Sequence, residues 1–334
     1  MSLARPVTVA VDAVGGDNAP GEILSGIALA LSDDPALHVL ITGPADIIDP
    51  FCAEHPGRTT PVATTEIIEM GEHPANAVRT KKDSSIVVGS RLVKDGRAEA
   101  FFSAGSTGAC MAAATLVIGR IKGVSRPAIA TVLPTAGPPC VMLDVGANAD
   151  CKAEQLVQFA HMGAAYATVV LGVEKPRVAL LNIGGEPTKG SALAQETYAL
   201  LTEQMPDFIG NIEGNDVLQG FADVIVTDGF TGNVALKLLE GTSRVLLGQV
   251  KAAMTANAVS TLAAALLKPA MLRLKQRLDP DTYGGAPLLG INGISIIGHG
   301  SSSATAVANA LRVAASAARG GLTEKIAAAI SSAN

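Results

Sequence analysis

Four short segments rich in Gly, Ser, Thr and Asn each stand between an apolar run and a helix-like segment: 103–108 (SAGSTG), 182–185 (NIGG), 228–233 (DGFTGN) and 298–303 (GHGSSS). A helix start carries free N–H groups and a partial positive charge, and glycine lets an anion approach the backbone. The pattern therefore predicts phosphate-type anion sites at some of these turns, with Ser106, Thr107, Gly184 and Gly232 as candidate contacts. The alternative is that an α/β fold needs such tight turns for structural reasons alone.

A polar run at 70–89 stands out in a chain with only 16% charged residues. It contains His73, Arg79, Lys81 and Lys82 beside several hydroxyl groups. A basic cluster with hydroxyls suits a phosphate or the phosphopantetheine arm of a carrier, whereas the alternative is a solvated loop and helix start. Lys189 follows the turn at 182–185 and brings a positive charge to an anion there, unless it is a surface lysine.

Other reactive residue types give weaker indications. The segment LDVGANAD contains Asp144, Asn148 and Asp150. Side chains of these types can orient a base, bind a cation or cap the next helix, and we expect Asp150 to be the cap. The four cysteines lack metal-ligand spacing, and Cys151 as an acyl-carrying nucleophile is a minor alternative. We expect no metal site, and the absence of GxxxxGKS/T, GxSxG and HExxH motifs disfavours the enzyme classes that use them.

The elements that would position these residues follow a repeated strand-then-helix pattern. Apolar runs end at the turns named above, and segments with helical periodicity follow them. This alternation predicts a single α/β domain over 1–334, with a mostly parallel sheet covered by helices and ligands beyond the carboxyl ends of the strands. The net charge of −5 argues against a protein that coats nucleic acid. The start of the chain lacks a signal-peptide pattern, so we expect a cytoplasmic protein.

Two segments bear on membrane contact. The stretch 98–119 fits a buried strand, a polar turn and a buried helix better than a membrane span. A helical excursion at 245–282 includes TLAAALLKPAMLRLKQRL at 261–278, where we expect Pro269 to separate two short helices. The resulting basic amphipathic hairpin would lie on an anionic membrane surface or form a dimer or interdomain contact. Its basic residues are Lys268, Arg273, Lys275 and Arg277.

Seven segments in order along the chain resemble the bacterial phosphate acyltransferase family PlsX: 9–20 (VAVDAVGGDNAP), 72–89 (EHPANAVRTKKDSSIVVG), 101–109 (FFSAGSTGA), 143–152 (LDVGANADCK), 180–190 (LLNIGGEPTKG), 224–241 (VIVTDGFTGNVALKLLEG) and 283–303 (YGGAPLLGINGISIIGHGSSS). Val14 stands where the family usually has Met, and 185–187 depart from its usual Thr-Glu-Glu style. The resemblance implies transfer of a fatty acyl group from acyl carrier protein to inorganic phosphate. The acyl phosphate would then serve phospholipid synthesis through a glycerol-3-phosphate acyltransferase.

The same resemblance implies a three-layer α/β/α fold, similar to phosphotransacetylases and to the isocitrate/isopropylmalate dehydrogenase type. It further implies a homodimer, peripheral association with the inner face of the membrane, and no cofactor. Three other functions remain open. They are a phosphotransacetylase that uses acyl-CoA, a metal- and NAD-dependent dehydrogenase on the same fold, and a non-catalytic membrane scaffold.

In the implied reaction phosphate is itself the nucleophile, so the enzyme has to position it and stabilise the tetrahedral oxyanion. We expect Lys189 to hold phosphate or the oxyanion, and Asn233 to orient it through its amide. Candidate phosphate donors are the N–H groups around Gly232, Ser106 and Thr107. Arg79, Lys81 and Lys82 would guide phosphate or the acidic carrier protein, and His73 is a weaker catalytic candidate.

Overall fold

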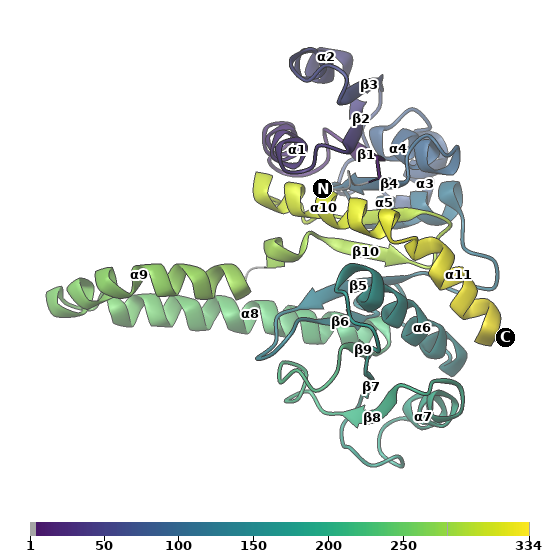
Figure 1. The fold of residues 1–334 in the computed structure, drawn as a ribbon, viewed down its shortest axis with the longest axis vertical. Helices are drawn as coiled ribbons and strands as arrows, with labels where there is room; N and C mark the ends of the chain where they lie inside the picture. The colour runs from purple at the N-terminus through teal and green to yellow at the C-terminus, as the bar shows by residue number, and fades with distance from the viewer. Residues whose placement is uncertain (1–4, 279, 334) are drawn as a thin grey trace.

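The computed structural model describes residues 5–278 and 280–333, apart from the side chains of 273–281 and 333. Eleven strands in this part of the chain form one sheet in the order β3-β2-β1-β4-β11-β10-β5-β6-β9-β7-β8 (Figure 1). The strands are β1 Val7–Asp12, β2 Leu37–Gly43, β3 Thr59–Ala63, β4 Ala100–Ser103, β5 Ala128–Leu133, β6 Cys140–Leu143, β7 Val178–Leu181, β8 Phe208–Ile212, β9 Val224–Val226, β10 Ala286–Leu289 and β11 Ile294–Ile297.

Helices precede or follow most of these strands, as the alternating pattern predicts. They are α1 Gly21–Asp33, α2 Ala45–Glu54, α3 Pro74–Thr80, α4 Ser85–Lys94, α5 Thr107–Ala113, α6 Ala153–Val170, α7 Ala192–Gln204, α8 Gly229–Met254, α9 Ala258–Leu278, α10 Ala304–Arg319 and α11 Leu322–Ala333. A π-helical turn, Ala114–Ile118, continues α5, and a 3₁₀ turn, Pro280–Tyr283, precedes β10. The stretch 98–119 therefore holds β4, a turn and a helix, as expected.

The sheet is mostly parallel but consists of two blocks that run in opposite directions. Strands β3, β2, β1, β4 and β11 are mutually parallel, and so are β6, β9, β7 and β8. Antiparallel pairs β11–β10, β10–β5 and β5–β6 join the blocks. The reversal arises because β5 to β6 and β10 to β11 are joined by short connections, and a short connection can only return the chain antiparallel.

Apolar cores lie on both faces of the sheet, which gives three layers. On one face, Val9 and Val11 of β1 pack in the same core as Ile27 of α1. On the other face, Ala10 belongs to the core that contains Ile86 of α4. Strands buried on both faces are apolar along their whole length rather than alternating. The predicted three-layer α/β/α architecture is confirmed.

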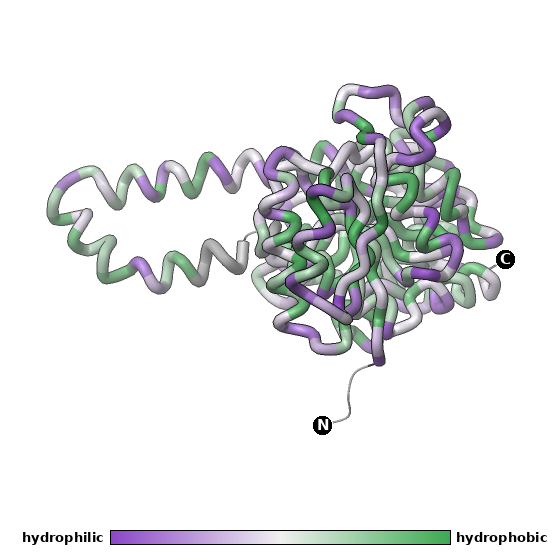
Figure 2. Tube along the Cα trace, turned by 90° about the horizontal axis from the view of Figure 1, so that it is seen from above, coloured by the Kyte–Doolittle hydropathy of each residue, from purple (hydrophilic) through white to green (hydrophobic). Residues whose placement is uncertain are grey.

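Helices α8 and α9 form a long hairpin that projects from the body of the protein (Figures 1 and 2). Helix α9 continues through Pro269, so the prediction of two short helices is wrong. Proline keeps a helical φ and removes only one N–H donor, and α9 packs along α8. Lys268 is exposed, whereas the side chains of Arg273, Lys275 and Arg277 lie outside the described residues. Within the described chain, no helix has the length and apolar character needed to span a membrane.

Candidate functional site

Asp144 follows β6 directly and is the centre of a buried hydrogen-bond network. Its side chain is fully buried, and burial raises the pKa of its carboxyl group while the hydrogen bonds act in the opposite direction. The carboxylate accepts the N–H groups of Ile129 (3.1 Å), Gly146 (3.2 Å), Ala147 (3.0 Å) and Asn148 (2.7 Å), and the Asn148 side-chain amide (2.8 Å). Asp144 therefore fixes the loop after β6.

The helix that follows this loop begins later than the sequence pattern indicated. Residue Lys152 precedes the first turn of α6, and its N–H donates to Gln155 Oε1 at 2.9 Å. Asp150 lies two residues too early to cap α6, so that expectation is wrong.

The start of α8 is capped and docked against the same loop. The Asp228 carboxylate accepts the backbone N–H of Thr231 at 2.9 Å and its hydroxyl at 2.7 Å. The N–H of Gly229 donates to the carbonyl oxygen of Asn148 at 2.8 Å. These bonds fix where the first turn of α8 lies relative to β6.

Gly232 has no space for a side chain. A Cβ atom there would lie 1.9 Å from the Asp144 carbonyl oxygen, so the helix packs directly on the strand end. Asn233, the next residue, is exposed, and its amide carbon lies 3.8 Å from the position that a Cβ on Gly146 would take. The close contact at Gly232 thus holds Asn233 over the loop that Asp144 fixes.

Lys189 lies in the loop that follows β7, the strand next to β9. Asn182 shapes this loop, because its side chain accepts the N–H of Ile183 (2.8 Å) and donates to the Lys189 carbonyl oxygen (3.1 Å). Gly184 is buried, and a Cβ there would lie 3.0 Å from Lys189 Cγ, so the lysine stem lies over this glycine. Among the described residues, no ion pair involves the Lys189 ammonium group.

Ser106 and Thr107 belong to a second group of residues, at the ends of β1, β4 and β11. An open pocket of about 570 Å³ lies between the loops after these strands, and Glu72, His299 and Asp17 also line it. Ser106 caps α5 by accepting the N–H of Ala109 at 3.4 Å, and Thr107 is the first residue of that helix.

Asp12 fixes the turns beside this pocket by hydrogen bonds, as Asp144 fixes the loop after β6. Its buried carboxylate accepts the Ser103 hydroxyl at 2.7 Å and the N–H of Val14 at 3.1 Å. The Ser103 oxygen in turn accepts the N–H of Gly105 at 3.0 Å. Burial raises the pKa of Asp12. The network ties the turn after β1 to the turn after β4.

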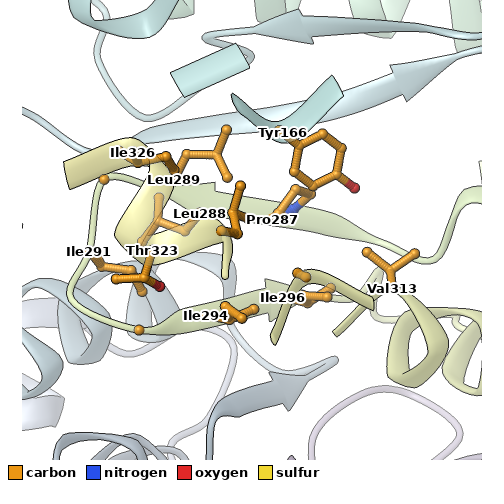
Figure 3. A pocket seen from close by; sticks show the side chains of 14 residues that line it. Tyr166, Pro287, Leu288, Leu289, Ile291, Ile294, Ile296, Val313, Thr323 and Ile326 are labelled. Carbon is orange, nitrogen blue, oxygen red and sulfur yellow. The ribbon is translucent and has the colours of Figure 1, made fainter. Parts of the chain in front are cut away.

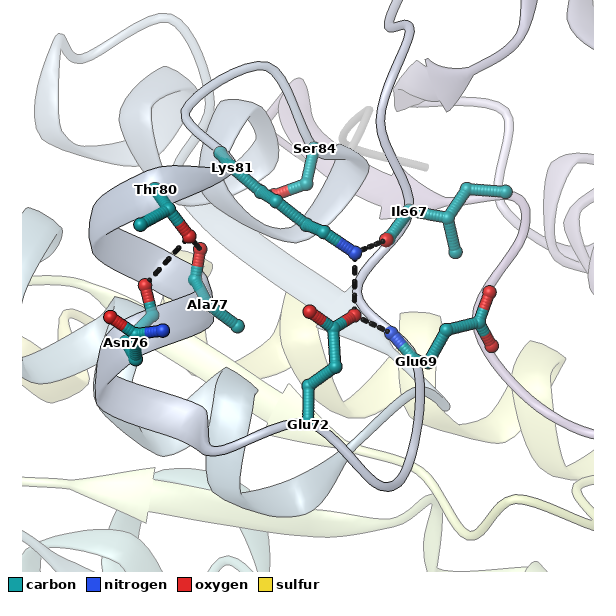
Figure 4. Close-up of polar contacts among 8 residues, drawn as sticks. All are labelled: Ile67, Glu69, Glu72, Asn76, Ala77, Thr80, Lys81 and Ser84. Atoms are coloured by element: carbon teal, nitrogen blue, oxygen red, sulfur yellow. Dashed lines mark hydrogen bonds and ion pairs between the residues drawn. The ribbon is translucent and has the colours of Figure 1, made fainter.

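Lys81, a predicted phosphate contact, is already bound within the protein. Figure 4 shows its ammonium group between Glu72 Oε1 (2.6 Å) and the carbonyl oxygen of Ile67 (2.7 Å). Lys81 lowers the pKa of Glu72, so this carboxylate is ionised. Arg79 and Lys82 are exposed, as is His73, which precedes α3. His73 is not among the residues that line the pocket.

The predicted site residues thus form two groups rather than one. Lys189, Gly184, Gly232 and Asn233 surround the carboxyl ends of β7 and β9, whereas Ser106 and Thr107 stand at the end of β4. The sequence reasoning missed Asp17 at the pocket and the supporting roles of Asp12 and Asp144. The available signal was the carboxylate that directly ends an apolar strand in VAVD and follows one in VMLD.

A smaller, buried cavity lies elsewhere, between β10, β11 and helices α6, α10 and α11 (Figure 3). It has a volume of about 10 Å³, room for about one water molecule. The Tyr166 hydroxyl beside it has no hydrogen-bond partner among the described residues, and burial raises its pKa. This cavity is too small for a substrate. Within the described residues, no group of three His, Cys, Asp or Glu side chains is placed to share a metal ion.

The cysteines are poor nucleophiles. Burial raises the pKa of Cys110 and Cys140 to about 12, and that of Cys151 to about 11. A thiol reacts as its thiolate, so these values disfavour covalent catalysis through Cys151.

Comparison with known proteins gives a consistent result over nearly the whole chain. A family model described as "Fatty acid synthesis protein" matches residues 7–325. The phosphate acyltransferase of Heliobacterium modesticaldum is 53% identical and covers 92% of each chain. That of Desulfitobacterium hafniense (strain DSM 10664 / DCB-2) is 51% identical and covers 95% of this chain and 96% of the relative.

Solved structures share the fold at much lower identity. A phosphotransacetylase from Streptococcus pyogenes superposes with a TM-score of 0.63 at 17% identity, covering 94% of each chain. A 4-hydroxythreonine-4-phosphate dehydrogenase from Burkholderia phymatum gives 0.51 at 14% identity, covering 93% of this chain and 98% of that one. The expected likeness of fold to phosphotransacetylases and to a dehydrogenase type is confirmed.

The sequence resemblance is confirmed by the family match and by these relatives. The chain therefore belongs to the phosphate acyltransferase family, whose members transfer an acyl group to phosphate.

Proposed function

We propose that this enzyme transfers a fatty acyl group from acyl carrier protein to inorganic phosphate, with Lys189 and Asn233 at the reacting centre. The observation that carries the proposal is the Lys189 ammonium group, which has no acidic partner among the described residues. Strands β7 and β9 are parallel neighbours, so the loop with Lys189 and the helix start with Asn233 leave the same edge of the sheet.

The chemistry requires positioning more than activation. An oxygen of the hydrogen phosphate dianion attacks the thioester carbonyl carbon and the C–S bond breaks. The proton that the phosphate loses passes to the thiolate that leaves, directly or through water. Lys189 offsets the charge of phosphate, and the Asn233 amide donates to the oxyanion that develops on the carbonyl oxygen. Because phosphate is the nucleophile, the reaction needs no cysteine thiolate, and the high pKa of Cys151 does not lower the rate.

The donor and the fate of the product complete the proposal. Carrier proteins of this kind are acidic, and the exposed cations Arg79 and Lys82 are suited to attract one. The acyl phosphate would be consumed by a glycerol-3-phosphate acyltransferase in phospholipid synthesis. Replacing both residues with Ser should raise the KM for acyl carrier protein but leave turnover of a short acyl thioester unchanged. An equal loss of activity with acyl carrier protein and with the short acyl thioester would contradict a role of Arg79 and Lys82 in attracting the carrier protein.

The α8–α9 hairpin supports two contacts that we propose for the whole protein. Apolar side chains near the body, Val234 (54% exposed) and Leu238 (69% exposed), suit a second copy of the chain. Apolar side chains near the tip, Val259 (79%) and Leu262 (70%), suit a membrane surface. Leu262→Asp should abolish flotation with anionic vesicles but leave the dimer intact in sedimentation. A variant that still floats contradicts the membrane contact.

Replacement of Lys189 tests the reacting centre. Removing one group that stabilises transition-state charge typically costs about 100- to 1,000-fold in kcat. We therefore expect Lys189→Ala to lose acyl phosphate formation by about that factor while the fold and the dimer persist. Lys175, exposed and in the loop before β7, provides a matched control as Lys175→Ala. Near-normal turnover by Lys189→Ala would remove Lys189 from the mechanism.

A further inference from the structure

The pocket at the ends of β1, β4 and β11 differs in charge from what a phosphate site needs. Asp17 and Glu72 line it, and no Lys or Arg side chain is among its lining residues in the part of the chain that the structure describes. Lys81, whose ammonium group contacts the lining residue Glu72, is bound to that carboxylate and to a carbonyl oxygen. A phosphate dianion here would meet the Asp17 carboxylate without a free cation to offset it.

What the pocket does offer is hydrogen bonding to an uncharged ligand. The N–H groups of Thr107 and Gly108 open α5 and belong to the first turn, where no carbonyl oxygen of the helix can accept them. The hydroxyl groups of Ser106 and Thr107 lie beside them. Met70 and Pro74 supply apolar wall, and Pro74 packs on Gly108, where a Cβ would lie 2.5 Å from its Cγ.

His299 adds one more donor. Its Nδ1 accepts the N–H of Ser301 at 3.2 Å, which assigns the ring proton of the neutral form to Nε2. Backbone donors, hydroxyls, an imidazole N–H and short apolar walls match a chain of amides and methylene groups. The volume of about 570 Å³ lies within the range of small-molecule sites.

We propose that this pocket binds the uncharged, amide-containing arm of the thioester donor next to its reacting end, and that phosphate binds instead at Lys189. The inference rests on the proposed acyl transfer and divides its two substrates between the two groups of residues. Ser106 and Thr107 then contact the acyl thioester rather than phosphate.

The twist of the sheet reduces the angle between the directions in which β4 and β9 end. Five strand pairings separate β4 from β9, and the two strands run in opposite directions. A twist of about 20–25° per pairing accumulates to about 100–125°. The angle between the directions of β4 and β9 is then roughly 55–80°, instead of the roughly 180° of two antiparallel strands in a flat sheet. Acyl transfer then requires that the thioester held at the end of β4 meets the phosphate held at the ends of β7 and β9.

A bulky side chain in the pocket tests whether the thioester binds there and phosphate binds elsewhere. Thr107 is exposed and begins α5, so Thr107→Phe adds bulk at the pocket without removing a buried contact. We expect the KM for the acyl thioester to rise by about tenfold or more, since a small steric misfit in a pocket is worth about 10- to 200-fold. The KM for phosphate should stay within about twofold. Thr202→Phe on the exposed face of α7 is the matched control.

Pantetheine provides a second readout that does not depend on the variant. It should inhibit the wild-type enzyme competitively against the acyl thioester and not against phosphate, and Thr107→Phe should weaken this inhibition. A rise in the KM for phosphate with Thr107→Phe, or inhibition competitive with phosphate, would overturn the inference. The proposed function itself would fail differently, because the wild-type enzyme would then form no acyl phosphate from any thioester.

Discussion

Replacement of Gly232 by Ala would place a methyl group in the contact between α8 and the end of β6. The added Cβ would lie 1.9 Å from the Asp144 carbonyl oxygen and 2.9 Å from Thr227 Cγ2. Real Cβ atoms essentially never come closer than 3.0 Å to such neighbours, so the first turn of α8 has to move by the difference between 3.0 and 1.9, about 1.1 Å.

This shift reaches the proposed reacting centre because Asn233 is the next residue in the same turn. A misplacement of about 1 Å at a positioning group costs about 100-fold in rate. Crowding a tight contact with one methyl group costs about 1–3 kcal/mol of stability. We therefore expect Gly232→Ala to lower kcat by about two orders of magnitude and to remain folded.

Phosphate-dependent release of thiol from acyl carrier protein measures kcat, and urea denaturation measures the free energy of unfolding. The control is Gly241→Ala in the same helix, where a new Cβ meets no atom within 4 Å. This change should raise helix stability by up to about 1 kcal/mol and leave kcat unaltered. A Gly232→Ala enzyme with wild-type kcat would refute the argument that this contact positions Asn233.

Two further predictions concern buried and reactive groups. Burial raises the native pKa of Asp12 above 3.8, so the native state holds this proton more tightly than the unfolded chain. Its contribution to stability therefore falls as the pH rises from about 3.8 through the native pKa. The unfolding free energy of wild type minus that of Asp12→Asn, from urea titrations between pH 4 and 8, should fall with pH, and a rise would contradict the shift. Cys151, with a pKa of about 11, is only about 0.1% thiolate at pH 8, so Cys151→Ala should keep full turnover. An acyl-enzyme trapped on Cys151 would contradict phosphate as the direct nucleophile.

The repeated units of this fold were predictable because they depend on local patterns. Buried strands such as CVML at 140–143 and VIV at 224–226 are continuous apolar runs, and Gly and Asn mark the turns that follow. The reversal between the two blocks was not predictable in this way. It depends on the return of β5 to β6 and of β10 to β11, which local residue patterns do not specify.

The candidate site shows the same limit at the level of side chains. Lys189 and Asn233 could be named from their turns, and the structure brings their strands together. Lys81 had the same chemistry in sequence, yet the fold brings Glu72 to within 2.6 Å of it. Asp12 and Asp144 carry a sequence signal, a carboxylate at the end of an apolar run, but their supporting role depends on N–H groups that only the folded loops supply.

The most direct test of the central claim is thiol release from a long-chain acyl carrier protein, measured with and without inorganic phosphate, together with detection of the acyl phosphate by ³¹P NMR. The account predicts release only when phosphate is present, with one acyl phosphate formed for each thiol, and a lower rate with the CoA thioester. Thiol release that does not require phosphate, or a hydroxy acid oxidised with reduction of a nicotinamide cofactor and no acyl phosphate, would contradict it.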